Sequence, residues 1–197
     1  MAGDGVRLIR ARDYRRMRWK NGLGETAEVA IEPAGAALDR FDWRVSMARV
    51  ESSGPFSAFA GIDRTLTVLD GAGFRLAVEG HPVAELTPGS APFPFPGDRP
   101  ASATLLAGPV TDLNVMTRRA DWWHGVRRLG AEETAAGRTA GATALVVCAG
   151  RSALVRTGGT SVELGALDTL LVTDASATIE VAAATAGGLV LVEIGPR

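Results

Sequence analysis

The chain has 197 residues, of which 46% are hydrophobic and 22% charged, and its 21 Lys and Arg residues nearly balance its 22 Asp and Glu residues. This is the composition of a globular protein, and a net charge of -1 gives no general attraction to nucleic acid or anionic lipid. No stretch approaches the ~20 apolar residues of a membrane-spanning helix, and the first residues lack the apolar centre of a signal peptide. We therefore expect a cytoplasmic protein with neither nucleic acid nor membrane as a partner.

Basic residues are concentrated in residues 7–20, which include six arginines and Lys20. Such a segment is typical of a basic arm or an Arg-rich transit peptide. Asp13 interrupts it, and it leads directly into a polar motif. We interpret it as a solvated first segment.

Short runs with alternating or β-branched character fill the first part of the chain and are separated by Gly-, Pro- and Asp-containing turn signals. This spacing predicts strands over residues 26–31, 43–50, 65–69, 74–78, 104–106 and 113–117. A second series predicts strands over residues 144–148, 153–157, 161–164, 169–172, 178–181 and 189–194. The chain thus consists of two β halves, typical of sandwiches or barrels.

Residues 121–142 show no strand pattern, and we interpret them as a connector between the halves. The expected division is residues 1–120, 121–142 and 143–197. Alanine-rich segments at 34–38 and 131–136 are the only helix candidates, and both are short for independent helices. Cys148 ends an apolar run, so a buried and inert thiol is expected there.

Strand alternation places every second residue on the same face of a sheet. Over residues 43–50, Arg44, Ser46 and Ala48 share one face, and over residues 113–118 the same holds for Asn114, Met116 and Arg118. For any single arginine, a sheet with one wet face explains this pattern. Taken together, Arg44, Arg118 and Arg64 would line a polar interior, and guanidinium groups are suited to bidentate contact with carboxylates. The implied ligand is a small acid.

Lysine and asparagine are rare in this chain, which contains 20 arginines but only Lys20, Asn21 and Asn114 of these two types. Lys20 offers a compact ammonium group and Asn21 both a donor and an acceptor. Gly22 and Gly24 beside them allow unusual backbone angles and a close approach of a ligand. A surface turn that needs a glycine bend is the alternative.

Metal and nucleophile signals are weak. Neither His81 nor His124 has a second histidine or a carboxylate at ligand spacing. The glycine pairs lack the Lys-Ser/Thr of a phosphate loop, and no serine has a G-x-S-x-G setting. We expect no metal and no cofactor.

Several motifs together resemble the HutD/Ves family. They are YRRMRWKNGLGET at 14–26, FDWRVSMA at 41–48, GPFS at 54–57, GIDR at 61–64 and NVMTRR at 114–119. The resemblance implies two degenerate, jelly-roll-like cupin barrels in one chain (a bicupin), a ligand pocket in the first, and an association with histidine-utilisation operons. Metal-binding cupins carry a His-x-His pair, and the corresponding segment 54–61 has no histidine, which implies a metal-free pocket.

The leading hypothesis is an accessory or regulatory protein of histidine utilisation that binds formimino- or formylglutamate. Arginines would hold the carboxylates, Asn21, Asn114 and Ser46 the polar cap, and Trp19 would cover the mouth. The expected ligand-binding residues are Trp19, Lys20, Asn21, Glu25, Arg44, Ser46, Arg64, Asn114 and Arg118.

Two other hypotheses stay open. One is a metal-independent isomerase or hydrolase acting on a similar acid, with Glu25 or Asp63 as general base and Lys20 as acid or electrophile. The other is an interaction protein with a vestigial pocket. A homodimer is expected from the frequency of such assemblies alone.

Overall fold

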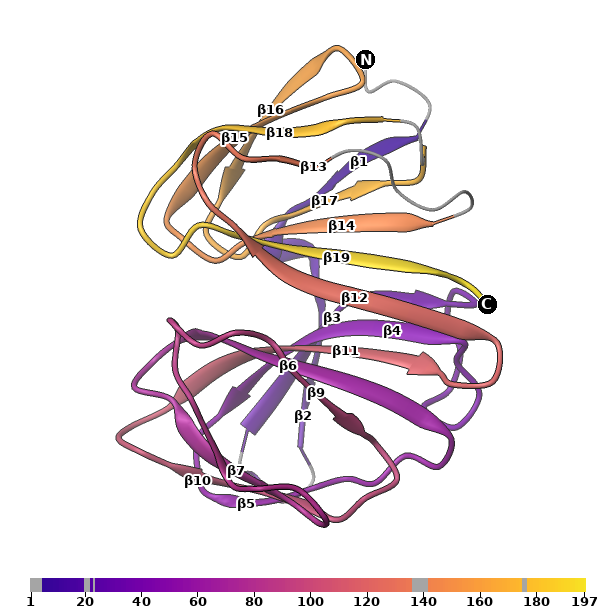
Figure 1. Ribbon diagram of the computed structural model, residues 1–197, viewed down its shortest axis with the longest axis vertical. Helices are drawn as coiled ribbons and strands as arrows, with labels where there is room; N and C mark the ends of the chain where they lie inside the picture. The colour runs from indigo at the N-terminus through magenta and orange to yellow at the C-terminus, as the bar shows by residue number, and fades with distance from the viewer. Residues whose placement is uncertain (1–4, 20–21, 23, 136–141, 175–176) are drawn as a thin grey trace. The chain divides into compact units, whose positions relative to one another are not determined.

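The computed structural model describes residues 5–19, 22, 24–135, 142–174 and 177–197 (Figure 1). Nearly all regular structure in these residues is β-strand, and the single helix among them is the 3-10 turn η1 (Ala11–Asp13). The predicted all-β class is therefore confirmed. The strands form two compact units: a central unit, Arg15–Trp122, and a terminal unit that combines Met1–Tyr14 with Trp123–Arg197.

The larger sheet of the central unit is antiparallel, with the strand order β2-β3-β4-β11-β6-β9. Its members are β2 (Arg15–Arg18), β3 (Gly24–Glu32), β4 (Trp43–Val50), β6 (Ile62–Asp70), β9 (Phe93–Pro96) and β11 (Val110–Arg118). The inner strands β4, β11 and β6 are buried on both faces over most of their length. Several polar side chains on these strands, among them Arg44, Arg64 and Asp112, are therefore withdrawn from solvent.

The smaller sheet of the central unit has the order β5-β10-β7-β8. It contains β5 (Gly54–Phe56), β7 (Phe74–Val78), β8 (Ala84–Leu86) and β10 (Ala101–Leu105). One apolar cluster joins it to the larger sheet, with Leu66 and Phe95 on one side and Phe74, Leu76 and Ala103 on the other. The two sheets thus pack face to face through a shared core.

The terminal unit repeats this arrangement. Its five-stranded sheet, ordered β1-β17-β14-β19-β12, contains β1 (Val6–Ile9), β12 (Trp122–Leu129), β14 (Thr143–Cys148), β17 (Thr169–Val172) and β19 (Leu189–Pro196). Its four-stranded sheet, ordered β13-β18-β15-β16, contains β13 (Thr134–Ala135), β15 (Ser152–Thr157), β16 (Thr160–Gly165) and β18 (Ile179–Ala184). A continuous apolar cluster with members on both sheets fills the space between them.

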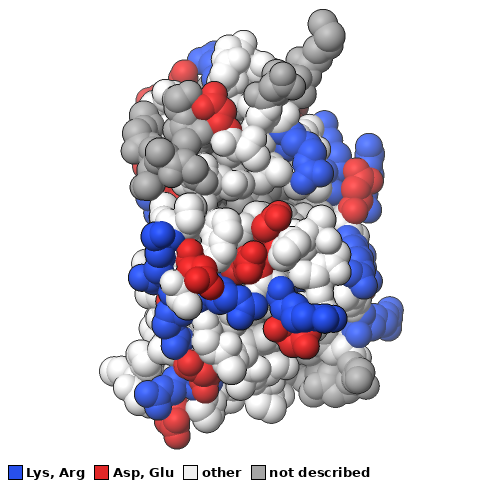
Figure 2. Space-filling model, turned by 90° about the vertical axis from the view of Figure 1, so that its right-hand side faces the viewer, with Lys and Arg blue, Asp and Glu red and all other residues white. Residues whose placement is uncertain are grey.

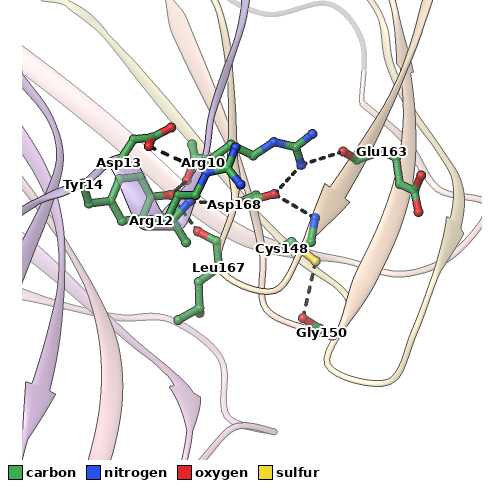
Figure 3. Close-up of polar contacts among 12 residues, drawn as sticks. Arg10, Arg12, Asp13, Tyr14, Cys148, Gly150, Glu163, Leu167 and Asp168 are labelled. Carbon is green, nitrogen blue, oxygen red and sulfur yellow. Dashed lines mark hydrogen bonds and ion pairs between the residues drawn. The ribbon is translucent and has the colours of Figure 1, made fainter.

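Residues 5–14 join the terminal unit through a buried carboxylate, Asp168 (Figure 3). Its oxygens accept hydrogen bonds from Arg10 Nη1 at 2.7 Å, from the Ala11 amide at 2.8 Å and from the Gly165 amide at 2.9 Å. The Tyr14 hydroxyl donates to the Leu167 carbonyl at 2.6 Å. These bonds fasten the N-terminal segment to the turn between β16 and β17.

The division into units differs from the expected one in two places. Residues 5–14 belong with the second half of the chain, because β1 adds to β17 with Val6 opposite Val172. The expected connector 121–142 contains β12 and β13 instead of forming a strand-free link. The sequence does not indicate β12, because Gly125, Arg127 and Arg128 interrupt the alternation that identifies a half-buried strand.

Each strand predicted from the sequence is present, and those at 43–50, 74–78 and 169–172 have the predicted bounds. The strands that the sequence pattern did not indicate are β1, β2, β5, β8, β9, β12 and β13. All seven are sheet-edge strands. Edge strands tolerate charge and proline, as in the Arg-rich β2 and in β9 with Pro94 and Pro96. Neither alanine-rich segment is helical over its described residues.

Cys148 is fully buried at the end of β14, as predicted, with its sulfur 3.5 Å from the Gly150 carbonyl. Burial raises the pKa of this thiol. The described residues contain no helix with the length and apolar character needed to cross a bilayer. On the face shown in Figure 2, acidic and basic side chains are interspersed.

Candidate ligand-binding site

The central unit contains a cavity of about 520 Å³ above one face of its six-stranded sheet. β3, β4, β6 and β11 provide the floor, while Pro55, Phe56, Ser57 and Phe59 line it from β5 and the following loop. The floor residues alternate along each strand, and they are the residues that strand alternation placed together. The structure thus puts Arg44, Ser46, Arg64, Asn114 and Trp19 in one cavity.

The register of the sheet arranges the floor in three rows. Met116 of β11 lies opposite Arg44 of β4 and Arg64 of β6; the next inward-facing residue, Asn114, lies opposite Ser46 and Leu66; the next, Asp112, lies opposite Ala48 and Val68. Residues two apart on a strand are about 6.8 Å apart. The floor therefore runs from a cationic row through a neutral polar row to an acidic one.

Arg44 is already paired within the protein. Its Nε donates to Glu28 Oε2 at 2.9 Å, and both side chains are at least nine-tenths buried. Arg15 Nη1 lies 3.8 Å from the other oxygen of Glu28. A ligand carboxylate at Arg44 would have to share this guanidinium with Glu28.

Arg64 is buried, with 5% of its surface exposed, but its hydrogen-bond partners are neutral. Nη1 donates to the Ser57 carbonyl at 3.1 Å and Nε to Asn114 Oδ1 at 3.4 Å. None of the described carboxylates lies within ion-pair distance of it. Burial lowers the pKa of Arg64 to about 10, which leaves it a cation at neutral pH.

Three aromatic rings surround the Arg64 guanidinium. Its central carbon lies 5.6, 5.7 and 5.1 Å from the ring centroids of Phe56, Phe59 and Phe95. Cation–π contacts of this kind hold a guanidinium in place without neutralising its charge. Arg64 is therefore a fixed cation in the cavity wall that has no ion-pair partner among the described residues, although the charge of Asp112 acts on it from a longer distance.

Asp112 is the acidic lining residue that the sequence analysis did not identify. It is 1% exposed, lines the cavity, and neither carboxylate oxygen has a hydrogen-bond partner among the described residues. Burial raises the pKa of Asp112 to about 7, and the charge of Arg64 opposes this increase. The sequence does contain the information that places Asp112 in the cavity, because Asp112 is two residues from Asn114 and faces the same side of the strand. The strand was predicted to begin at Leu113, whereas β11 begins at Val110.

The indole of Trp19 lies at the cavity and donates from Nε1 to Thr26 Oγ1 at 2.8 Å. This bond fixes the ring against β3. Ser46 is 1% exposed, and the Asn114 amide nitrogen lies 3.6 Å from the Met116 sulfur. The polar groups of the middle row are thus partly available to a ligand.

Glu25 and Arg118 do not line this cavity. Glu25 is next to Thr26 on β3 and therefore faces the other side of the sheet, where it forms an ion pair with Arg16 at 2.8 Å. Arg118 donates to the Phe41 carbonyl at 2.8 Å and lines a separate cavity of about 330 Å³. Its position at the end of β11, where the chain turns away, explains why parity alone misplaced it.

Asp63, the other candidate base, pairs with Arg119 at 2.6 Å and does not line the cavity either. Lys20 and Asn21 lie outside the described residues, so their part in binding stays a prediction. Among the described residues, no three His, Cys, Asp or Glu side chains form a group suited to hold a metal ion.

The chain forms two units, each built from a larger and a smaller antiparallel sheet, and one unit has a polar cavity between its sheets. These features define a cupin-like protein. In agreement, the chain aligns over 93% of its length with a cupin 2 conserved barrel domain protein from Leptotrichia buccalis, covering 96% of that chain, with a TM-score of 0.58 at 7% identity. At this identity the likeness concerns the fold alone.

The chain belongs to the HutD family, whose model matches residues 11–191. The structure of HutD from Pseudomonas fluorescens SBW25 aligns over 98% of this chain and 99% of that one, with a TM-score of 0.81 and 33% identity. A Pseudomonas putida protein described as an uncharacterized 21.2 kDa protein in the hutC 3' region is 45% identical over 130 residues, 63% of this chain and 67% of that one. Protein Ves of Citrobacter koseri is 40% identical over 103 residues, so the match spans about half of each chain.

Proposed function

We propose that the central cavity binds a small carboxylic acid of the formimino- or formylglutamate type without a metal ion. The observation that carries this proposal is Arg64, a buried guanidinium with neutral partners. A buried cation without a direct ion-pair partner is costly, and a ligand carboxylate would reduce that cost. Ser46 and Asn114 in the next row would receive the polar remainder of the ligand.

We further propose that binding serves histidine utilisation in an accessory or regulatory role. The family relation supports this role, as does the description of the Pseudomonas putida relative as a protein in the hutC 3' region. A protein that senses or sequesters a pathway intermediate needs a selective cavity but no catalytic step.

Isothermal titration calorimetry with formylglutamate tests the binding proposal. Arg64→Lys should weaken binding by about 2 kcal/mol, because an ammonium group cannot reproduce the planar guanidinium fork. The diamide of the same compound, which has no carboxylate, should not bind measurably. Arg75→Leu is the matched control, because Arg75 is exposed in the same unit and pairs with Glu85. Equal affinity of the Arg64→Lys variant and the unmodified protein would contradict the proposal.

A second candidate function is a metal-independent hydrolase acting on the same acid. Asp112 favours it, because a buried carboxyl whose pKa is raised to about 7 is suited to general acid–base catalysis. This assigns the acid–base role to Asp112 instead of Glu25 or Asp63, which lie outside the cavity. Release of ammonia or formamide from formiminoglutamate by the purified protein, abolished in Asp112→Asn, would establish the enzyme. Tight binding without release would exclude hydrolysis.

A further inference from the structure

Asp112 has no function in the fold that its surroundings explain. Buried carboxylates are normally paired or hydrogen-bonded, because an isolated charge is costly inside a protein. Both oxygens of Asp112 lack hydrogen-bond partners among the described residues, although the residue is only 1% exposed. A carboxyl group left unsatisfied at a cavity wall is available to a molecule that enters the cavity.

The charged groups around the cavity are unevenly distributed. Its lining includes Arg18 from β2, Arg44 from β4 and Arg64 from β6, and Glu28 of β3 is held by Arg44. The part contributed by β5 and the following loop carries no charge. Asp112 is therefore the one acidic group that lines the cavity in the described part of the chain, and it lies two rows from the Arg44–Met116–Arg64 row.

Met116 and Asp112 are four residue steps apart along β11, which corresponds to about 13 Å between their Cα atoms. The long arginine side chains shorten the distance that a ligand must bridge. A molecule that contacts Arg64 with a carboxylate and continues past Asn114 would present its other end to Asp112.

We propose that Asp112 is a specificity-determining residue that accepts hydrogen bonds from a cationic N–H group, so that the cavity selects acids carrying a carboxylate at one end and an amidinium at the other. This inference rests on the proposed binding function and narrows its ligand class. N-formimino and N-formyl derivatives of one amino acid differ at this end by a single group, because the first carries a protonated imine nitrogen and the second a carbonyl oxygen. An ionised Asp112 attracts the first and repels the second.

The preference should depend on pH. With the pKa of Asp112 raised to about 7 by burial, the group is mostly protonated at pH 6 and mostly ionised at pH 8. A cationic ligand group favours the ionised form, so its binding lowers this pKa and releases a proton near neutral pH. Discrimination in favour of the amidinium should therefore increase as the pH rises from 6 to 8.

Calorimetric titration of formimino- and formylglutamate at pH 6 and pH 8 tests this inference. At pH 8 the formimino compound should bind on the order of 10-fold or more tightly than the formyl compound, and the ratio should narrow at pH 6. Asp112→Asn should remove the preference and its pH dependence. Asp70→Asn should keep both, because it makes the same charge change at an exposed position on β6.

Equal affinity for the two compounds at pH 8, or a preference that survives in Asp112→Asn, would overturn the inference while leaving the binding function intact. Binding of neither compound by the unmodified protein would overturn both proposals. Near-UV circular dichroism shows whether each variant is folded, and Asp112→Ala provides a second variant with the same expectation.

Discussion

Among the described residues, each of the two units has one buried aspartate, and the two aspartates have opposite hydrogen-bond surroundings. Asp168 in the terminal unit accepts bonds from Arg10 (Figure 3) and from the Ala11 and Gly165 amides, whereas Asp112 in the central unit accepts none from the described residues. Burial alone would raise the pKa of Asp168, but these hydrogen bonds outweigh it and lower the pKa. At Asp112 burial is not outweighed, and the pKa rises to about 7.

The interiors of the two units also differ in how polar they are. Apolar side chains such as Val146, Val155 and Leu191 fill the space between the sheets of the terminal unit. The corresponding space in the central unit has an apolar cluster in one part and a polar cavity in the other. One architecture therefore supports a packed core where the inward-facing residues are aliphatic and a polar cavity where they are Arg64, Asn114 and Asp112. We infer that Asp168 stabilises the fold, whereas Asp112 is retained at a cost in stability for a ligand.

The largest expected effect comes from the satisfied carboxylate. Asp168→Asn should reduce the free energy of unfolding by about 3–5 kcal/mol, because its three partners are all donors and an amide offers them one acceptor oxygen. Urea unfolding followed by circular dichroism measures this loss. Asp13→Asn, at an exposed position on the same segment, is the control and should change stability by less than about 0.5 kcal/mol. A loss of less than about 0.5 kcal/mol for Asp168→Asn would contradict a stabilising role of Asp168 and its difference from Asp112.

The same substitution at Asp112 should have the opposite sign. The folded-state pKa lies above the unfolded value, so the ionised group destabilises the folded protein progressively as the pH rises from about 4 to about 7. Without ligand, Asp112→Asn should be more stable than the unmodified protein by about 2 kcal/mol at pH 8, and the difference should shrink as the pH is lowered to 5. Thermal unfolding at the two pH values measures it. A less stable variant at pH 8 would show that Asp112 has a partner in the folded protein.

The smallest effect is expected at Glu25, which lies outside the cavity. Its ion pair with Arg16 is partly exposed, and such pairs contribute about 0–1 kcal/mol. Glu25→Gln should leave ligand affinity within about twofold of the unmodified protein when measured by calorimetry. A loss of tenfold or more would place Glu25 in the binding site, as the sequence suggested.

Much of the fold was predictable because the inner strands carry continuous patterns. Residues 43–50 and 169–172 are bounded by turn signals and rich in β-branched or apolar side chains, and both ends were predicted correctly. Of the edge strands, β16 was predicted and the others were not, because most of them are short or contain arginine, proline or glycine that breaks the alternation. The N-terminal segment joins the terminal unit through contacts between residues more than 150 positions apart, such as Arg10 and Asp168, for which no local pattern exists.

The candidate site was predictable where parity within a strand decides it. Arg44, Ser46 and Asn114 lie in the cavity for that reason. Parity did not reveal that Glu28 neutralises Arg44 or that Arg118 turns to the Phe41 carbonyl, because both depend on neighbours from distant segments. Asp112 was missed through a strand boundary placed too late, although its parity with Asn114 was visible in the sequence.

A crystal structure of the protein with formiminoglutamate tests the central claim most directly. We predict the ligand in the cavity of the central unit, with a carboxylate oxygen about 2.7–3.0 Å from a guanidinium nitrogen of Arg64 and the formimino nitrogen about 3 Å from an Asp112 oxygen. Ligand bound in the reverse orientation, or only in the cavity beside Arg118, would contradict the account.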